Sequence, residues 1–301
     1  MQMSYHDPVL LQECIQGLDI KEDGVYVDVT FGGGGHSREI LKRLGPNGKL
    51  FGFDQDKDAQ RNVIDDERFV LIPENFRFIK RFLRFHQVTK VDGILADLGV
   101  SSFQFDSPER GFSIRFDAEL DMRMNQSDQM SAKEILNTYA EEDLANIFYQ
   151  YGELRSSRGI ASAIVNARKN QLINSSFELT GILQKFLPVK RKNKILAQIF
   201  QALRIEVNQE MEVLKEFLLQ IPDLLKSDGR LAVISYHSLE DRLVKRFIRT
   251  GLFQGEPERD IYGNFSVPMK KMGGLIVPTD EEIARNNRAR SAKLRIATLS
   301  N

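Results

Sequence analysis

Residues 25–37, VYVDVTFGGGGHS, decide the fold of this chain. An apolar strand, four consecutive glycines and the start of a helix follow one another there without a spacer. Glycine permits positive φ and carries no Cβ, so such a join brings bare backbone against a nucleoside-type cofactor. A second apolar run ends at Asp54, twenty residues after Gly34, where a carboxylate can accept both hydrogen bonds of a ribose diol. The pattern predicts an α/β fold with its ligand at the strand ends.

The class of cofactor is indicated by Asp28, inside the strand before the glycines. A dinucleotide would bring its pyrophosphate here, and a neighbouring carboxylate would repel it. The sulfonium of S-adenosylmethionine would be attracted, so the pattern favours methyl transfer over hydride transfer. The spacing acid-x-Gly-x-Gly-x-Gly, usual in methyltransferases, is met by Asp28, Gly32 and Gly34, with Thr30 at the first glycine position. A flexible loop without a ligand is the alternative, although four glycines before a helix would destabilise the join.

Composition limits the class of protein. The chain has 301 residues, 42% of them apolar, enough for one large or two modest domains. No apolar run approaches the roughly 20 residues that cross a bilayer, and charge near the N-terminus argues against a secretory signal. The single cysteine, Cys14, suits a reducing compartment. We therefore expect a cytoplasmic protein with no membrane partner. Cys14 falls on an early helix pattern, which argues against cysteine-based attack on a pyrimidine C5.

The charge balance points to a selective partner. Lys+Arg and Asp+Glu are both 42, which argues against a protein that coats nucleic acid indiscriminately. Two local clusters, residues 185–194 (KFLPVKRKNK) and 285–295 (RNNRARSAKLR), carry five basic residues each. Either alone would be typical of a solvated surface. Together, beside a nucleoside-cofactor fold, they favour a nucleic-acid substrate.

Strand-like and helix-like runs alternate through the first third of the chain. The expected strands are 25–29, 50–53, 69–72 and 91–96, and the expected helices are 37–44, 56–64 and 75–85. This order predicts a parallel, doubly wound sheet whose ligand lies at the carboxyl ends of the strands. The glycine turn, Asp54 and Asp97 all fall at that edge.

A long helical stretch interrupts the alternation. About 130 residues separate the fourth strand from the next convincing one at 230–235, far more than one crossover needs. The stretch contains capping boxes that begin at Ser131 and Ser175. We expect an inserted all-helical domain at 106–205, placed to hold a large substrate, between the two parts of a main domain at 1–105 and 206–301. A purely structural insertion is the alternative. Farther on we expect a helix at 209–225, a helix capped by Ser238, a loop at 257–278 and a closing strand at 292–298.

Eight long motifs together resemble one known family. They are HDPVLL (6–11), VDVTFGGGGHS (27–37), DLGVSSFQFD (97–106), ERGFS (109–113), LDMRM (120–124), FQALRIEVNQE (200–210), ISYHSLEDRLVK (234–245) and NRARSAKLR (287–295). The combination spans essentially the whole chain and resembles the bacterial MraW-type family, also called RsmH. The resemblance implies a Rossmann-like class I methyltransferase with an inserted helical domain. It also implies S-adenosylmethionine as cofactor, and methylation of N4 of one cytidine in 16S rRNA near the decoding centre, with the small ribosomal subunit as partner.

The resemblance also implies a set of cofactor contacts. Matched motif by motif, they are Gly34, Gly35, His36, Asp54, Phe76, Asp97 and Gln104. In chemical terms, the glycine amides would approach the amino-acid end of the cofactor and Asp54 the ribose hydroxyls. Phe76 would offer an apolar face to adenine, and Asp97 would be an acceptor near the sulfonium or amino group. The structural alternatives are a helix cap for His36, an N-cap for Asp97 and a core position for Phe76.

The residue that accepts the N4 proton is not identifiable from the sequence. Many amino-methyltransferases place an Asp/Asn-Pro-Pro-aromatic tetrad after the fourth strand, whereas residues 97–102 here are DLGVSS. The candidates are Asp97, Ser101, Ser102 and His237. No His/Cys cluster has metal-ligand spacing, so no metal is expected. A nicotinamide oxidoreductase and a non-catalytic RNA-binding protein on a methyltransferase fold are the competing interpretations, and the oligomeric state, a homodimer included, stays open.

Overall fold

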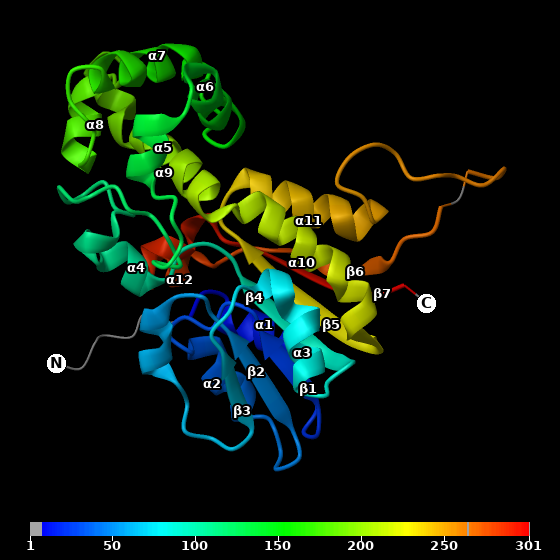
Figure 1. Ribbon diagram of the computed structural model, residues 1–301. Coiled ribbons are helices and arrows are strands. Elements are labelled where there is room, and N and C mark those ends of the chain that lie inside the picture. Colours follow the sequence, from blue (N-terminus) through cyan, green and yellow to red (C-terminus); the bar gives the residue numbers. More distant parts are fainter. Residues whose placement is uncertain (1–7, 264, 301) are drawn as a thin grey trace. The chain divides into compact units, whose positions relative to one another are not determined.

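The computed structural model describes residues 8–263 and 265–300 (Figure 1). His6 and Asp7 of the first motif therefore lie outside the described residues. The chain forms two compact units: residues up to Gly99 together with those from Met211 onward, and Val100–Glu210. The second unit takes in the whole segment 106–205 that the sequence marks as an insertion.

The first unit is built on a seven-stranded sheet with the order β3-β2-β1-β4-β5-β7-β6. Its strands are β1 Val25–Asp28, β2 Lys49–Phe53, β3 Phe69–Ile72, β4 Val91–Asp97, β5 Leu225–Ser235, β6 Met269–Ile276 and β7 Lys293–Leu299. The first five are parallel, β7 is antiparallel to β5, and β6 is antiparallel to β7. The prediction of a doubly wound, mostly parallel, Rossmann-like sheet is confirmed. The strand order reverses between β1 and β4, the place where such sheets bind ligands.

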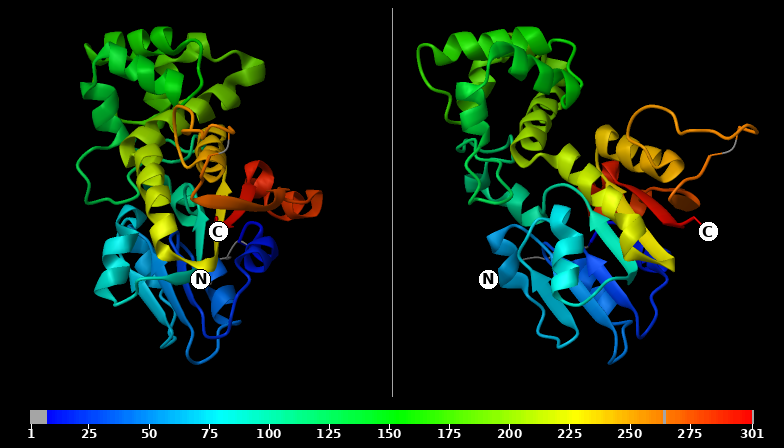
Figure 2. Two further views of the ribbon diagram at one scale, coloured as in Figure 1. Left: turned by 90° about the vertical axis from the view of Figure 1, so that its right-hand side faces the viewer. Right: turned by 45° about the vertical axis from the view of Figure 1, so that its right-hand side comes forward.

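Helices cover both faces of this sheet, as Figure 2 shows from two sides. One face packs against α3 Ile79–Phe85, α10 Glu210–Leu224 and α11 Ser238–Thr250. The other packs against α1 Leu11–Leu18 and α2 Gly35–Leu41. In β1, Val27 belongs to the first of these cores and Tyr26 to the second. A strand buried on both faces needs a nearly continuous apolar run, which explains the composition of β1.

The second unit has a core of its own. Its helices are α4 Ser102–Asp106, α5 Ala132–Thr138, α6 Glu141–Gln150, α7 Ser157–Arg168, α8 Ser176–Ile182 and α9 Lys192–Asn208. Phe148 of α6, Ile160 of α7 and Leu203 of α9 are fully buried in this core. Both predicted capping boxes are confirmed, with Ser131 starting α5 and Ser175 starting α8. Each box satisfies backbone N–H groups that a helix start leaves without partners.

Two expectations near the end of the chain were wrong. The segment 257–278, expected to be a loop, contains β6, which is mostly exposed and is held by antiparallel pairing with β7. An exposed edge strand has no buried face, so its sequence lacks the apolar alternation that identifies strands. The cap of α11 is His237 rather than Ser238, and His237 forms a capping box with Glu240.

The observed bounds of several elements in the first unit also differ from those expected from the sequence. The helix expected at 56–64 is a 3₁₀ turn, η1 Lys57–Asn62, with Asp56 as its N-cap. The helix expected at 75–85 divides into the 3₁₀ turn η2 Phe76–Phe78 and α3. Strand β5 begins at Leu225, because residues up to Arg230 form an irregularity opposite Val91 and Gly93 of β4.

Candidate active site

The glycine turn after β1 is held in one conformation by close contacts. Gly32 and Gly34 have φ of 49° and 74°, the left-handed region that favours glycine. A Cβ on Gly34 would lie 2.9 Å from the Phe31 ring, and one on Gly35 would lie 2.3 Å from Cγ of Pro8. The absence of side chains at these positions is therefore a packing requirement as well as a conformational one.

Two side chains bind the carbonyls of this turn. Asn62 Nδ2 donates to the Gly32 carbonyl at 3.0 Å, and an Arg38 terminal nitrogen donates to the Gly33 carbonyl at 2.6 Å. Arg38 also donates to the Asn62 carbonyl at 3.3 Å, which joins α2 to η1. These bonds fix the orientation of the turn's peptide planes before any ligand arrives.

Asp28 does not play the role that the sequence suggested. It is 1% exposed, and its carboxylate accepts from Ser37 Oγ at 2.7 Å and from the Thr30 amide at 3.1 Å. Burial raises its pKa, against the opposing effect of these hydrogen bonds and of His36. Asp28 thus stabilises the glycine turn through these hydrogen bonds, and its burial keeps it from facing a ligand. Thr30 has a role here as well, because its hydroxyl accepts from the Asp97 amide at 2.7 Å and ties the turn to β4.

Asp54 stands at the end of β2 with its carboxylate oriented by two backbone amides. Gly32 donates to one oxygen at 2.7 Å and Asp56 to the other at 2.9 Å. A carboxylate has about four acceptor positions, so capacity remains on both oxygens. Burial raises the pKa of Asp54 to about 7, partly offset by these two amide bonds. The group is therefore prepared for a ligand that supplies further donors.

Asp97 lies between an aromatic hydroxyl and an imidazole. The Tyr236 hydroxyl donates to Oδ1 at 2.8 Å, and Nδ1 of His36 lies 3.9 Å from Oδ2. Burial raises the pKa of Asp97 to about 6, and His36 and Tyr236 oppose the rise. Its side chain is 24% exposed, so the carboxylate can still be reached from outside. Tyr236 was missed by the sequence analysis, because nothing in its local pattern says that β5 pairs with β4.

The expectation that His36 could be a helix cap is wrong. Helix α2 begins at Gly35, with Gly34 as an N-cap that has no side chain to offer. His36 is buried, and its Nε2 lies 3.0 Å from the Val9 carbonyl. A carbonyl only accepts, so Nε2 carries a proton in this contact, and Nδ1 is the ring nitrogen that faces Asp97.

The glycine turn, Asp54 and Asp97 thus meet at the carboxyl ends of β1, β2 and β4.

Known proteins are similar to this chain over nearly its whole length. The model of the MraW methylase family matches residues 3–300. This chain belongs to the MraW methylase family. Three similar proteins carry the name Ribosomal RNA small subunit methyltransferase H. Those of Flavobacterium johnsoniae and Christiangramia forsetii are 68% and 65% identical, each over 98% of both chains. That of Bacteroides thetaiotaomicron is 56% identical over 98% of both chains.

In this MraW methylase, Phe76 is shared between core and surface. It opens η2, which begins four residues after the end of β3, and its ring is edge-on to Phe217 at a centroid separation of 5.2 Å. The core position considered for Phe76 is therefore real, but the residue stays partly exposed. Asn75 orients the segment by accepting from the Arg77 amide at 2.9 Å.

The other predicted residues of the methylase have local roles. Gln104, Ser101 and Ser102 belong to the second unit, and Gln104 is 5% exposed. Gln104 forms a capping box with Ser101 at the start of α4, in which its side-chain oxygen accepts from the Ser101 amide at 2.9 Å. His237 caps α11 through Nδ1, and its Nε2 lies 3.1 Å from Glu240. Among the candidates for proton acceptance, Asp97 is the one with an oriented and reachable oxygen in the first unit.

Proposed function

We propose that this protein transfers a methyl group from S-adenosylmethionine to N4 of a cytidine in 16S rRNA. The observation that carries the proposal is the match of residues 3–300 to the MraW methylase family, with relatives named as small-subunit rRNA methyltransferases at up to 68% identity. The site supports the proposal, because the carboxylates of Asp54 and Asp97 flank the glycine turn. The conformation of that turn is fixed by hydrogen bonds from Asn62 and Arg38 to its carbonyls.

The residues present fit the cofactor. When bound, S-adenosylmethionine supplies a methyl group on a positively charged sulfur. Asp54 has unused acceptor positions for the two hydroxyls of a ribose, and the side-chain-free backbone at Gly34 and Gly35 admits a close approach. Phe76 offers the exposed part of its ring to adenine. Asp97 adds negative charge at the end of β4, which suits a cation.

Asp97 is the proposed proton acceptor. The lone pair of a cytosine N4 is delocalised into the ring, and an acceptor for its N–H makes that pair more available. The Tyr236 hydroxyl orients one oxygen of Asp97, and a pKa of about 6 leaves the group ionised at neutral pH while keeping it basic enough to take a proton. Cys14 is not a competing nucleophile: it is fully buried, and burial followed by the charge of Asp97 raises the pKa of its thiol.

The second unit is proposed to hold the RNA. Its basic cluster at 185–194 is mostly exposed, as phosphate contacts require. The cluster at 285–295 is partly committed to the fold, because Arg295 and Lys293 pair with Asp241 at 2.7 and 3.5 Å. We also propose a cytoplasmic location, because an rRNA substrate is found there. Among the helices of residues 8–263 and 265–300, none has the length and apolar content to span a membrane.

The test uses tritiated methyl-labelled S-adenosylmethionine with small ribosomal subunits that lack the modification. Nucleoside analysis should give labelled N4-methylcytidine, and Asp97→Asn should abolish the label while the subunits stay intact. Free 16S rRNA in parallel shows whether the folded particle is the substrate, and sedimentation of the enzyme shows whether it is a homodimer. Label on a ring carbon, or no label on RNA, would contradict the proposal. Calorimetry should detect binding of S-adenosylmethionine and no binding of NAD. The reverse result would favour an oxidoreductase.

A further inference from the structure

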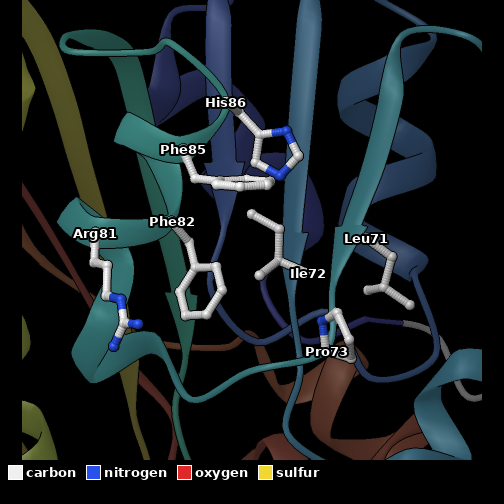
Figure 3. A pocket seen from close by; sticks show the side chains of 7 residues that line it. All are labelled: Leu71, Ile72, Pro73, Arg81, Phe82, Phe85 and His86. Atoms are coloured by element: carbon white, nitrogen blue, oxygen red, sulfur yellow. The ribbon is translucent and has the colours of Figure 1, made fainter.

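A cavity of about 330 Å³ lies in the first unit between α3 and the edge strand β3. Figure 3 shows Phe82, Phe85 and His86 projecting from the α3 side toward Leu71, Ile72 and Pro73. Its walls are aromatic rings and aliphatic side chains, with the guanidinium of Arg81 at one end. A volume of this size is at the lower end of the range for small-ligand sites, and flat walls of this kind suit a planar ring.

The aromatic wall is unusually open to solvent. Phe85 is 80% exposed and Phe78, at the preceding turn, is 41% exposed. The ring of Phe85 stands edge-on to that of His86 at a centroid separation of 5.4 Å. Large apolar side chains that stay exposed beside a cavity indicate a binding surface more often than a defect of packing.

The α3 side of the cavity is basic. Residues 75–91 contain five Lys or Arg and no Asp or Glu. On the side facing α10, the ion pairs Arg77–Glu216 and Lys80–Asp223 neutralise two of these charges.

Arg81 lines the cavity, and Arg84 lies on the same helix, α3. Arg81 and Arg84 form no ion pair with any of residues 8–263 and 265–300. Arg81 instead lies with its guanidinium carbon 5.9 Å from the centre of the Phe82 ring, an arrangement that keeps the charge beside the aromatic wall. The charge of Arg84 acts on Asp223 without forming an ion pair. Arg81, with no ion pair and next to exposed rings, fits an anionic ligand that carries flat rings.

We propose that this α3 surface, formed by Phe82, Phe85, His86, Arg81 and Arg84, binds a single-stranded segment of the RNA substrate. One unpaired base enters the cavity and stacks on Phe85, while the two guanidinium groups hold the adjacent phosphates. The inference rests on the proposed function, which supplies RNA as the substrate. Stacking on an aromatic ring accepts any base, so this contact anchors the strand rather than reading its sequence.

A second copy of the chain is a less suitable occupant. A twofold contact would bring the basic α3 surfaces of two copies together, and like charges at an interface are unfavourable. RNA has the complementary charge and supplies the planar rings that the cavity walls suit.

The experiment measures methylation of small subunits by full-length variants. Phe85→Ala should raise KM for the RNA substrate about tenfold, with the dissociation constant for S-adenosylmethionine at the wild-type value. Arg81→Gln and Arg84→Gln should each reduce the slope of log affinity against log salt by about 0.7. The matched controls are Tyr262→Ala, since Tyr262 is 83% exposed, and Arg249→Gln on exposed α11 surface; both should leave KM unchanged.

Direct contact is tested separately by ultraviolet cross-linking of wild-type protein to RNA oligonucleotides containing 5-iodouridine. The cross-linked peptide should cover residues 75–90 and be lost in Phe85→Ala. An unchanged KM in Phe85→Ala together with no cross-link in this segment overturns the α3 site, even when the wild type methylates RNA normally. Loss of a sedimenting dimer in Phe85→Ala with KM unchanged would assign the surface to a second copy instead. If the wild type methylates no RNA at all, the proposed function itself fails.

Discussion

Tyr236→Phe tests whether Asp97 is the group that titrates in catalysis. The change removes the hydroxyl that donates to Asp97 Oδ1 at 2.8 Å and keeps the ring. A hydrogen bond to a charged group contributes about 1.5–3 kcal/mol, and 1.36 kcal/mol corresponds to one pH unit. Because Asp97 is 24% exposed, water replaces part of the lost bond, so the lower end of this range applies. In the pH–rate profile, the pH at which the rate is half-maximal on the acidic side should rise by about one unit.

The direction follows from the charged form that the bond stabilises. Tyr236 donates to the carboxylate and holds the pKa of Asp97 down, against the effect of burial that raises it to about 6. Without the hydroxyl, Asp97 stays protonated to higher pH. The variant should therefore be slower than the wild type at pH values below neutrality.

The assay is single-turnover methyl transfer from pH 5 to pH 9 with saturating RNA and cofactor. Tyr26→Phe is the matched control, since the Tyr26 hydroxyl accepts from the Lys21 amide at 2.8 Å on another part of the same unit. That variant should keep the wild-type limb. If Tyr236→Phe is active and its acidic limb does not move, Asp97 is not the titrating acceptor.

Three further results are expected. Asp54→Asn should weaken binding of S-adenosylmethionine at least about tenfold by calorimetry, because a charged acceptor is lost, whereas Asp65→Asn on exposed surface should not. Gly35→Ala should lower the free energy of unfolding by about 1–3 kcal/mol, because its Cβ would meet Pro8 at 2.3 Å. Gly181→Ala, with no atom within 4 Å, should raise it by about 1 kcal/mol, and equal urea midpoints for the two variants would contradict the packing argument. Finally, the contribution of Asp54 to the free energy of unfolding of the ligand-free protein, measured as wild type minus Asp54→Asn in urea titrations, should fall as pH rises from 3.8 to about 7. Folded Asp54 keeps a proton there that the unfolded chain has released, so a difference that is flat or rises with pH would be inconsistent with its raised pKa.

The parallel, doubly wound sheet was predictable because its sequence signals are local. Each of β1 to β4 is a short apolar run followed by a turn signal, and parallel pairing follows from the alternation of strands with helices. The positions of Asp54 and Asp97 were predictable for the same reason, since any residue that ends a parallel strand lies at the ligand edge. The capping boxes at Ser131 and Ser175 are also local, as each needs only four residues.

What the sequence by itself determined is therefore the α/β architecture, the glycine turn and the two acids beside it, because these depend on periodicity and on contacts within a few residues. The tertiary structure alone decided which acid stays accessible from outside. Asp28 and Asp97 both end apolar strands, but packing buries Asp28 under the turn and leaves Asp97 reachable. It also decided that Tyr236 bonds to Asp97 across 139 residues of chain, since that contact exists only where β5 lies beside β4. Spacing along a chain carries no information about such a pair, because its geometry is set by how the strands are ordered in space.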